Sequence, residues 1–404
     1  MTRLKIQHLQ ILFAAIIATT SISPPLANLF EILLVLGLFA SKSAIENTAL
    51  YVKTVDFKIH MAFMVLLLLG IAYPLADTQT YFASILNWRK FLLLPIGYVL
   101  FMNDAAQKEK ALQYIFYFLL TITVVAAVYK SQLLPFFNES VIHYQIGTTS
   151  SEGMFVAVAL AIVLSSIIQH THMLGLPKAA ELIAALFLVG YIAFMTTGRS
   201  GYAAMLIIVL FLTFKHLKTY ENKMGLKFWI GLLFVAALSV ILLMSSQTSS
   251  SRIHQALNEF KQAETDANNH VVTSIGQRVN FWKNTIEMIP QYYMWGAGTG
   301  SFQAAYAKHV ANKTGLEAAV TQDPHNQYMK ILIEQGVIGL MLFLGMISRS
   351  LVQFNNKDKH YLLGSAVICI WIFTSSFNAH FTTFMEGTFI WAWMGLMNRH
   401  SSPP

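Results

Sequence analysis

The chain has 404 residues, of which 55% are hydrophobic and only 11% are charged, against about 25% charged residues in a typical soluble protein. This composition excludes an ordinary soluble domain and predicts an all-α, polytopic integral membrane protein. The net charge of +8 does not require a nucleic acid partner, because the distribution of basic residues is better explained by membrane topology.

About twelve segments come close to or reach the ~20 apolar residues that cross a bilayer. The predicted spans are 9–23, 26–41, 59–75, 86–103, 111–129, 152–168, 178–196, 201–217, 226–246, 326–348, 361–378 and 384–398. The first of them begins like a signal peptide, but no A-x-A cleavage site follows and a second span starts within a few residues. We therefore expect a retained first helix.

An even number of spans places both termini on the same side of the membrane. The short loops on that side contain "TRLK", "KSAIENTALYVK", "QKEK", "KHLKTYENK" and "NNKDK", whereas the short loops on the other side have few basic residues. The positive-inside rule then predicts that both termini are cytoplasmic.

One connection is much longer and more polar than the others. The chain accordingly divides into a membrane part with spans one to nine (1–246), an outward-facing helical segment (247–325), and a membrane part with spans ten to twelve and a short cytoplasmic tail (326–404). The outward segment has no net charge, and "SRIHQALNEFKQA" and "RVNFWKNTIEMI" within it have helical periodicity. Connections of this length are functional or disordered, and the periodicity favours a folded, functional segment.

Two arginines face outward at membrane ends, where ionisable residues are costly and informative. Arg199 lies in "TTGRSGY" between the seventh and eighth spans, and its glycine, serine and threonine neighbours favour contact with an anion. Arg278 opens an outward helix, where its planar fork and the helix N-terminus both suit phosphate. The alternatives are a snorkelling interfacial arginine for Arg199 and a surface arginine without a role for Arg278.

A histidine, His325, directly precedes the tenth span in "DPHNQYMKILIEQGVIGL". Histidine titrates near neutrality and can take a proton from an attacking hydroxyl, and Asp323 or Asn326 could orient its ring. Ordinary helix-start chemistry explains Asp323 and Pro324, but it gives no reason for the histidine.

Other candidates are weaker. Arg89 in "NWRK" is a secondary anion-binding candidate, since interfacial anchoring also explains it, and "GAGTGS" at 296–301 resembles a phosphate-cradling loop only loosely. We expect no metal site, because the outward histidines lack ligand spacing and the single cysteine, Cys369, cannot form a Cys-rich centre.

Three blocks, "TTGRSG", "RVNFWKN…GAGTGSF" and "DPHNQYMKILIEQGVIGL", resemble in this order the O-antigen ligase/polymerase superfamily of bacterial envelope glycosyltransferases. The last block fits a family pattern of His-Asn, nine residues, then Gly-x-x-Gly, formed here by His325, Asn326, Gly336 and Gly339. The single large outward segment between spans nine and ten is most similar to that of the O-antigen ligases.

The resemblance implies a reaction in lipopolysaccharide biosynthesis, on the periplasmic face of a Gram-negative inner membrane. A glycan would pass from an undecaprenyl pyrophosphate carrier to the lipid A–core oligosaccharide, without a metal or other cofactor and with inversion at the anomeric carbon. The family's essential residues correspond to Arg199, Arg278 and His325, with the arginines stabilising pyrophosphate and the histidine acting as general base.

Several alternatives remain at this point. An O-antigen polymerase would use the same donor but extend a second carrier-linked glycan, and a further enzyme class would transfer the glycan to protein. A lipid-linked oligosaccharide flippase or other transporter would have charged residues at the midplane and an internal repeat. The polar groups here gather at one face, which favours an enzyme.

Overall fold

The computed structural model is entirely helical over the residues that it describes, and this confirms the predicted all-α class. The described residues are 4–72, 75–102, 104–131, 149–169, 173–220, 243–265, 273–353 and 360–398, with isolated positions between 230 and 241.

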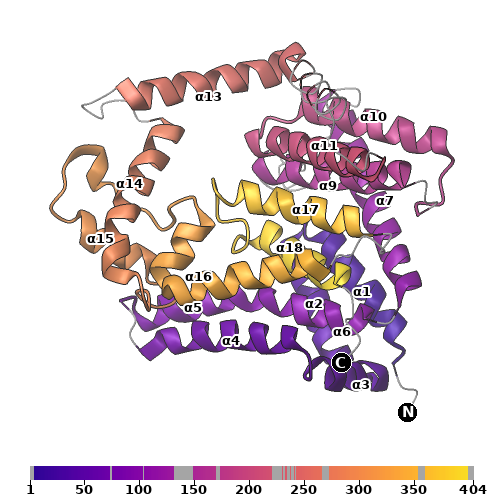
Figure 1. Ribbon diagram of the computed structural model, residues 1–404, viewed down its shortest axis with the longest axis horizontal. Coiled ribbons are helices and arrows are strands. Elements are labelled where there is room, and N and C mark those ends of the chain that lie inside the picture. Colours follow the sequence, from indigo (N-terminus) through magenta and orange to yellow (C-terminus); the bar gives the residue numbers. More distant parts are fainter. Residues whose placement is uncertain are drawn as a thin grey trace.

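The helices follow one another from the N-terminus as shown in Figure 1. In chain order they are α1 (Ile6–Thr19), α2 (Pro24–Ala40), α3 (Lys42–Tyr51), α4 (Val55–Leu69), η1 (Gly70–Ala72), α5 (Thr78–Trp88), η2 (Arg89–Leu92), α6 (Leu93–Phe101), α7 (Ala105–Lys130), α9 (Thr149–Ile168), α10 (Lys178–Met195), α11 (Arg199–Tyr220), α13 (Gln247–Thr265), α14 (Ser274–Tyr292), α15 (Phe302–Val310), η3 (Gly315–Ala318), α16 (Gln327–Gln353), α17 (Tyr361–Thr374) and α18 (Phe384–Met397).

Within the described ranges, five helical stretches are long and apolar enough to cross a membrane, fewer than the twelve expected. They are Val55–Ala72, Ala105–Lys130, Ser151–Ile168, Lys178–Met195 and Gln327–Val352, each at a predicted span. A sixth is possible if α2 and α3 count as one span, but they meet at 90°. Part of the predicted loop "KSAIENTALYVK" is therefore helix α3 and not a loop.

The other predicted spans differ from single long helices for physical reasons. Helices α1, α17 and α18 have 14 residues each, about 21 Å of helix, which is shorter than the ~30 Å hydrocarbon core. The predicted span 86–103 is divided among the end of α5, the 3₁₀ turn η2 and α6. The span 201–217 lies within α11, and 226–246 falls almost wholly outside the described residues.

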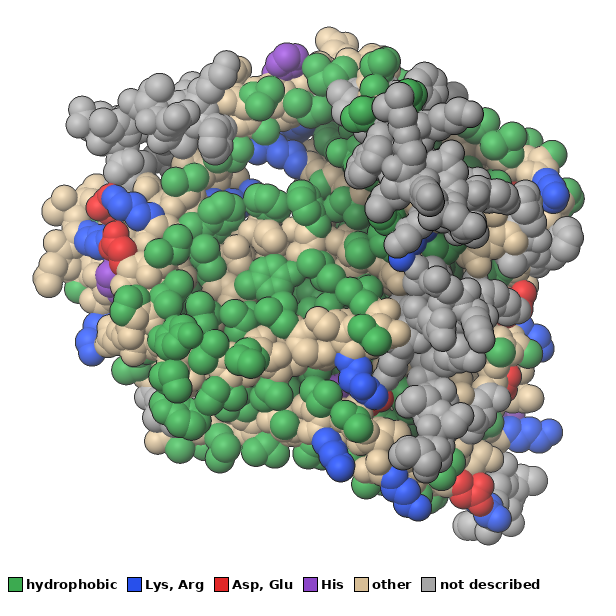
Figure 2. Space-filling view, viewed as in Figure 1, with side chains coloured by type: hydrophobic (Ala, Val, Ile, Leu, Met, Phe, Trp, Pro, Cys, Tyr) green, Lys and Arg blue, Asp and Glu red, His purple; other side chains and the backbone are tan. Residues whose placement is uncertain are grey.

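Helix α9 lies at the centre of the membrane part, packed by α7, α10, α11 and α17. It approaches α11 closely because glycines meet there: a Cβ built on Gly153 would lie 2.5 Å from Gly201 Cα. This contact fixes the first turn of α11, and so the height of Arg199. Large apolar side chains are exposed on α4, α5 and α16, and Figure 2 shows hydrophobic side chains covering that face.

The outward segment forms the helices that periodicity predicted. Helix α13 contacts α10 and α11 on one side and α14 on the other, so that it arches between the membrane helices and α14 (Figure 1). Helices α14 and α15 share a small apolar core of their own around Phe281, Met288 and Tyr306. The space beneath the arch is the region of interest.

A break inside α16 joins the outward segment to the membrane part. Gly336 has φ +65°, and the loop before α15 binds the backbone groups around this break: Ala297 N–H donates to Ile333 O (2.8 Å), and Val337 N–H donates to Tyr293 O (2.7 Å). A Cβ on Gly336 would lie 2.2 Å from the carbonyl oxygen of Met294. Unpaired backbone at membrane depth is tolerated only when protein covers it, and this loop provides the cover.

Candidate active site

A cavity of about 660 Å³ lies beneath α13. Four parts of the chain build it: the start of α11, one face of α13, the first half of α14, and the connection between α17 and α18. The lining residues are Thr197, Gly198, Arg199, Ser200, Ala203, Arg252, Gln255, Glu259, Ser274, Ile275, Arg278, Val279, Trp282, Phe373, Thr374, Phe377, Asn378 and His380. In Figure 2 an opening is visible below the arch, with basic side chains at its edge.

Arg199 and Arg278, predicted as anion contacts, both line this cavity. Arg199 forms a bidentate pair with Glu259 of α13, with its nitrogens 3.0 and 3.3 Å from the carboxylate oxygens. Glu259 is only 8% exposed, so this pair fastens α13 to the first turn of α11. One of the two predicted cations therefore already has a carboxylate partner.

Arg278 is in a different electrostatic state. Its guanidinium has no hydrogen bond or ion pair with any residue that the structure describes. Burial, and after it the charge of Arg199, lowers the pKa of Arg278, while Glu259 acts in the opposite direction. A partly desolvated cation held near a second cation is stabilised by an anion, and phosphate fits the planar fork.

His325 lies next to the cavity but is not among the residues that line it. Its imidazole stacks on Phe281 of α14, with ring centroids 6.2 Å apart, and its Nδ1 is buried without a hydrogen-bond partner. The preceding carbonyl, Pro324 O, accepts a hydrogen bond of 2.9 Å from the indole of Trp282, which does line the cavity. Trp282 thus connects the wall of the cavity that contains Arg199 and Arg278 to the backbone next to His325.

Asp323 and Asn326, predicted to orient the His325 ring, make their side-chain hydrogen bonds to backbone groups and to Lys330. The Asp323 carboxylate accepts the His325 N–H (2.6 Å) and pairs with Lys330 at 3.2 Å. Asn326 caps α16 by accepting from the N–H groups of Tyr328 and Met329. Together they maintain His325 at φ +53°, a left-handed conformation that is uncommon outside glycine.

Arg89 lies outside the cavity. Its guanidinium donates to Asn28 Oδ1 (2.6 Å) and lies 3.7 Å from a carboxylate oxygen of Glu31, so that it ties η2 to α2. The next residue, Lys90, is 1% exposed and donates to Thr382 O in the α17–α18 connection.

The glycine-rich stretch at 296–301 is engaged by α16 and does not form a phosphate cradle. The N–H groups of Ala297 and Gly298 donate to Ile333 O and Glu334 O, and that of Gly300 bonds to the Glu334 carboxylate. Within the described part of the chain, no group of three or more His, Cys, Asp and Glu residues could hold a metal ion.

Three ionisable residues that line the cavity were not predicted as site residues: Arg252, Glu259 and His380. Glu259 and Arg252 sit on α13, where the alternation of charged and apolar residues looked like an ordinary amphipathic helix. A usable signal existed for His380, because "SSFNAHF" is a polar stretch between two apolar segments too short to span a bilayer separately.

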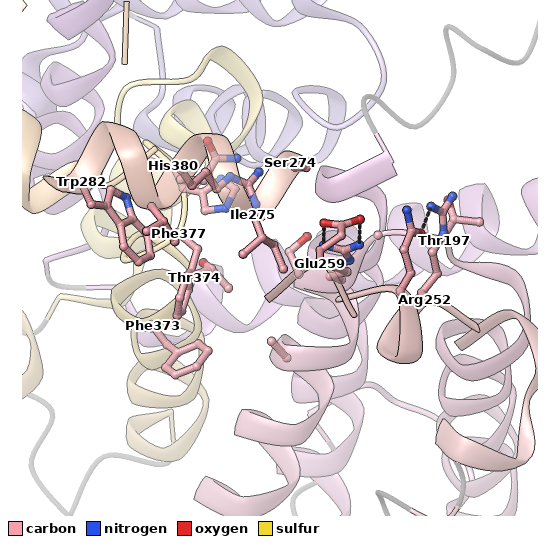
Figure 3. A pocket seen from close by; sticks show the side chains of 18 residues that line it. Thr197, Arg252, Glu259, Ser274, Ile275, Trp282, Phe373, Thr374, Phe377 and His380 are labelled. Atoms are coloured by element: carbon pink, nitrogen blue, oxygen red, sulfur yellow. Dashed lines mark hydrogen bonds and ion pairs between the residues drawn. The ribbon is translucent and has the colours of Figure 1, made fainter. Parts of the chain in front are cut away.

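The lining has two chemically different ends. In Figure 3 the aromatic side chains of Trp282, Phe373 and Phe377 lie to one side, and Glu259 and Arg252 lie to the other. Three arginines against one carboxylate make the lining positive, which suits an anionic group, and the aromatic end suits the apolar faces of a sugar or a lipid chain.

Comparison with known proteins places this site in context. Residues 184–344 match the family described as O-antigen ligase, and this range contains Arg199, Glu259, Arg278 and His325. A protein of Haemophilus influenzae, described as uncharacterized, is 23% identical over 288 residues, which cover 69% of this chain and 68% of that protein.

Proposed function

We propose, because residues 184–344 match the family described as O-antigen ligase, that the protein is a membrane glycosyltransferase that moves a glycan from undecaprenyl pyrophosphate to the lipid A–core oligosaccharide. The observation that carries the proposal is the cavity beneath α13, where three arginines face a single carboxylate. A lipid-linked diphosphate supplies both the anion and the apolar chain that this lining suits.

In this reaction the bond between the acceptor oxygen and the anomeric carbon forms as the bond between that carbon and the diphosphate oxygen breaks. The acceptor hydroxyl loses its proton, and undecaprenyl pyrophosphate leaves with the electron pair. Direct displacement inverts the anomeric centre. No metal is required if Arg199 and Arg278 stabilise the charge that develops on the leaving group.

His325 is the general base in this proposal. With Nδ1 buried, Nε2 is the nitrogen that can take the acceptor proton, a role worth typically 10²–10⁴-fold in rate. Asp323 and Asn326 position His325 through the backbone. The hydrogen bond between Trp282 and Pro324 fixes the position of His325 relative to the cavity wall. Arg89 stabilises the fold through Asn28 and Glu31 and does not touch the diphosphate.

The membrane setting belongs to the proposal too. We place the protein in the inner membrane of a Gram-negative bacterium with both termini cytoplasmic, and α13–α15 and the cavity in the periplasm. This orientation agrees with the basic loops and with the availability of the carrier-linked glycan on that side.

The test is transfer by the purified protein, without added metal, from undecaprenyl-pyrophosphate glycan to lipid A–core. We expect glycan-capped lipid A–core from wild type, and a rate about 10²–10⁴-fold lower from His325→Asn. Asparagine is the chosen replacement because it tolerates the left-handed backbone of this position. His254→Asn, at an exposed position of α13, is the matched control.

The remaining outcomes discriminate among the alternatives. Lengthening of the carrier-linked glycan without capped lipid A–core would identify a polymerase, which has the same donor and the same cavity. If neither product forms and wild type binds no carrier-linked diphosphate, the proposal is wrong. Full activity of folded His325→Asn would remove the base from the mechanism and leave the arginine cavity in place.

A further inference from the structure

A second histidine is buried in the cavity wall, outside the segment that matches the family. His380, in the connection between α17 and α18, is 1% exposed and lines the cavity. The reaction proposed above does not use it. A buried imidazole that lines a polar cavity needs a reason, because an apolar residue would fill the same space without a desolvation penalty.

His380 and Arg278 line the same cavity from different parts of the chain, His380 from the α17–α18 connection and Arg278 from α14. Ser274, Arg278 and Trp282 are spaced by four residues and so share one face of α14. In Figure 3 the label of His380 stands between those of Ser274 and Trp282, the other two residues of that face.

The back of the imidazole meets a buried carboxylate. Nδ1 of His380 lies 3.6 Å from Oε1 of Glu386, in the first turn of α18, and that oxygen accepts a hydrogen bond from the Ser151 hydroxyl of α9. Glu386 is 5% exposed, so the carboxylate is buried beside the imidazole and can hold its orientation. With Nδ1 directed to Glu386, Nε2 is the nitrogen left for a ligand.

The stretch around His380 is held rigidly. Gln327, fully buried at the start of α16, accepts from Phe381 N–H and from the Thr382 hydroxyl, and Lys90 donates to Thr382 O. The indole of Trp391 donates to Phe381 O. Three helices thus fix this short connection, as a binding group that must not reorganise requires.

We propose that His380, oriented by Glu386, is a third hydrogen-bond donor for the diphosphate, in the cavity that Arg278 also lines. This inference rests on the proposed function. Glu386 lies beside Nδ1 of the imidazole, and the cavity lining contains three arginines and one carboxylate, so an anion bound there would be within a positive surrounding.

The experiment is equilibrium binding of undecaprenyl pyrophosphate to the purified, detergent-solubilised protein. His380→Gln should raise Kd about tenfold or more, the effect of losing a hydrogen bond to a charged group. His309→Gln, at a histidine of α15 outside the cavity, is the matched control and should behave as wild type.

A second variant keeps the imidazole of His380 and removes the Glu386 carboxylate beside it. Glu386→Gln retains an acceptor for Ser151 but loses the charge that orients the imidazole, so it should raise Kd, though less than His380→Gln does. Inorganic pyrophosphate in a parallel titration separates the sources: weak binding with the same dependence on His380 would assign the donor to the diphosphate, and not to the lipid chain. Thermal melting of each variant verifies folding.

The outcomes separate the two proposals. If Arg278→Ala weakens binding but folded His380→Gln and Glu386→Gln match the control, the inference about His380 is overturned and the proposed function stands. If wild type binds no undecaprenyl pyrophosphate, the proposed function fails and this inference with it.

Discussion

Two arginines of one cavity have opposite energetic roles. Arg199 is neutralised by Glu259, whereas Arg278 has no such partner among the described residues, and burial next to another cation lowers its pKa. A folded protein that keeps such a cation does so at some expense of stability, which is common where a charge serves binding.

Replacing Arg278 with leucine should therefore separate stability from activity. Arg278→Leu removes a partly desolvated charge, and we expect the melting temperature to rise by about 2 °C while transfer falls about 10²–10³-fold. Melting curves in detergent and the transfer assay measure the two effects. A lower melting temperature would show that Arg278 contributes to the fold and not to an anion site.

Arg199→Leu provides the contrast. It leaves the Glu259 carboxylate buried without its cation, so both the melting temperature and transfer should fall. Glu259→Gln, which keeps a hydrogen-bond acceptor for Arg199, should be milder in stability. Equal melting temperatures for Arg199→Leu and wild type would mean that the pair does not hold α13.

At the scale of elements, glycines allow close contacts between backbones that a side chain would block. Gly336 allows the break in α16, and Gly153 with Gly201 brings α9 against α11 below Arg199. Each feature is a close contact between backbones that are distant in the sequence, and each helps to position an element that lines the cavity, α14 for the first and α11 for the second.

Alanine at Gly336 is expected to damage the protein. The left-handed φ of +65° and a backbone oxygen 2.2 Å from the new Cβ both oppose it. Gly345→Ala in the same helix is the control, because its Cβ would meet nothing within 4 Å. We expect a clear drop in melting temperature for the first variant and none for the second. Equal stability would mean that the break is not needed.

Gly153→Ala tests the second glycine contact. It should push α11 away from α9, move Arg199, and lower transfer more than Gly190→Ala, which places a methyl group in open space on α10. The transfer assay, with melting curves as the folding test, decides this. Unchanged transfer by Gly153→Ala would show that the height of Arg199 does not depend on this contact.

At the scale of the whole molecule, the question is on which side of the membrane the cavity lies. In a Cys369→Ala background, Lys308→Cys on α15 should react with a membrane-impermeant maleimide in intact spheroplasts. Lys110→Cys on α7 should react only after lysis; both positions are exposed. The reverse pattern would invert the topology.

How much the sequence predicted depended on the kind of residue. Arg199 and Arg278 were predictable because a charge near hydrocarbon stands out, and the helices of the outward segment were predictable from periodicity. The break at Gly336 was missed because its sequence also suits close helix packing, and only the backbone angle distinguishes the two. His380 was missed because its partners, Glu386 and Ser151, come from other helices, and nothing in the local sequence indicates that they meet.

The loop before α15 is hydrogen-bonded across the break in α16, and these bonds fix its position relative to the membrane. A bilayer holds α16 at one height, and hydrogen bonds at Ile333, Glu334 and Val337 lock the loop before α15 to that helix in a single register. The elevation of the α14–α15 unit, and with it the Arg278 wall of the cavity, is thereby set by the backbone itself. The lipid-linked diphosphate proposed as substrate has its head group at a fixed depth in the bilayer, and the backbone of α16 holds the Arg278 wall at a fixed depth as well.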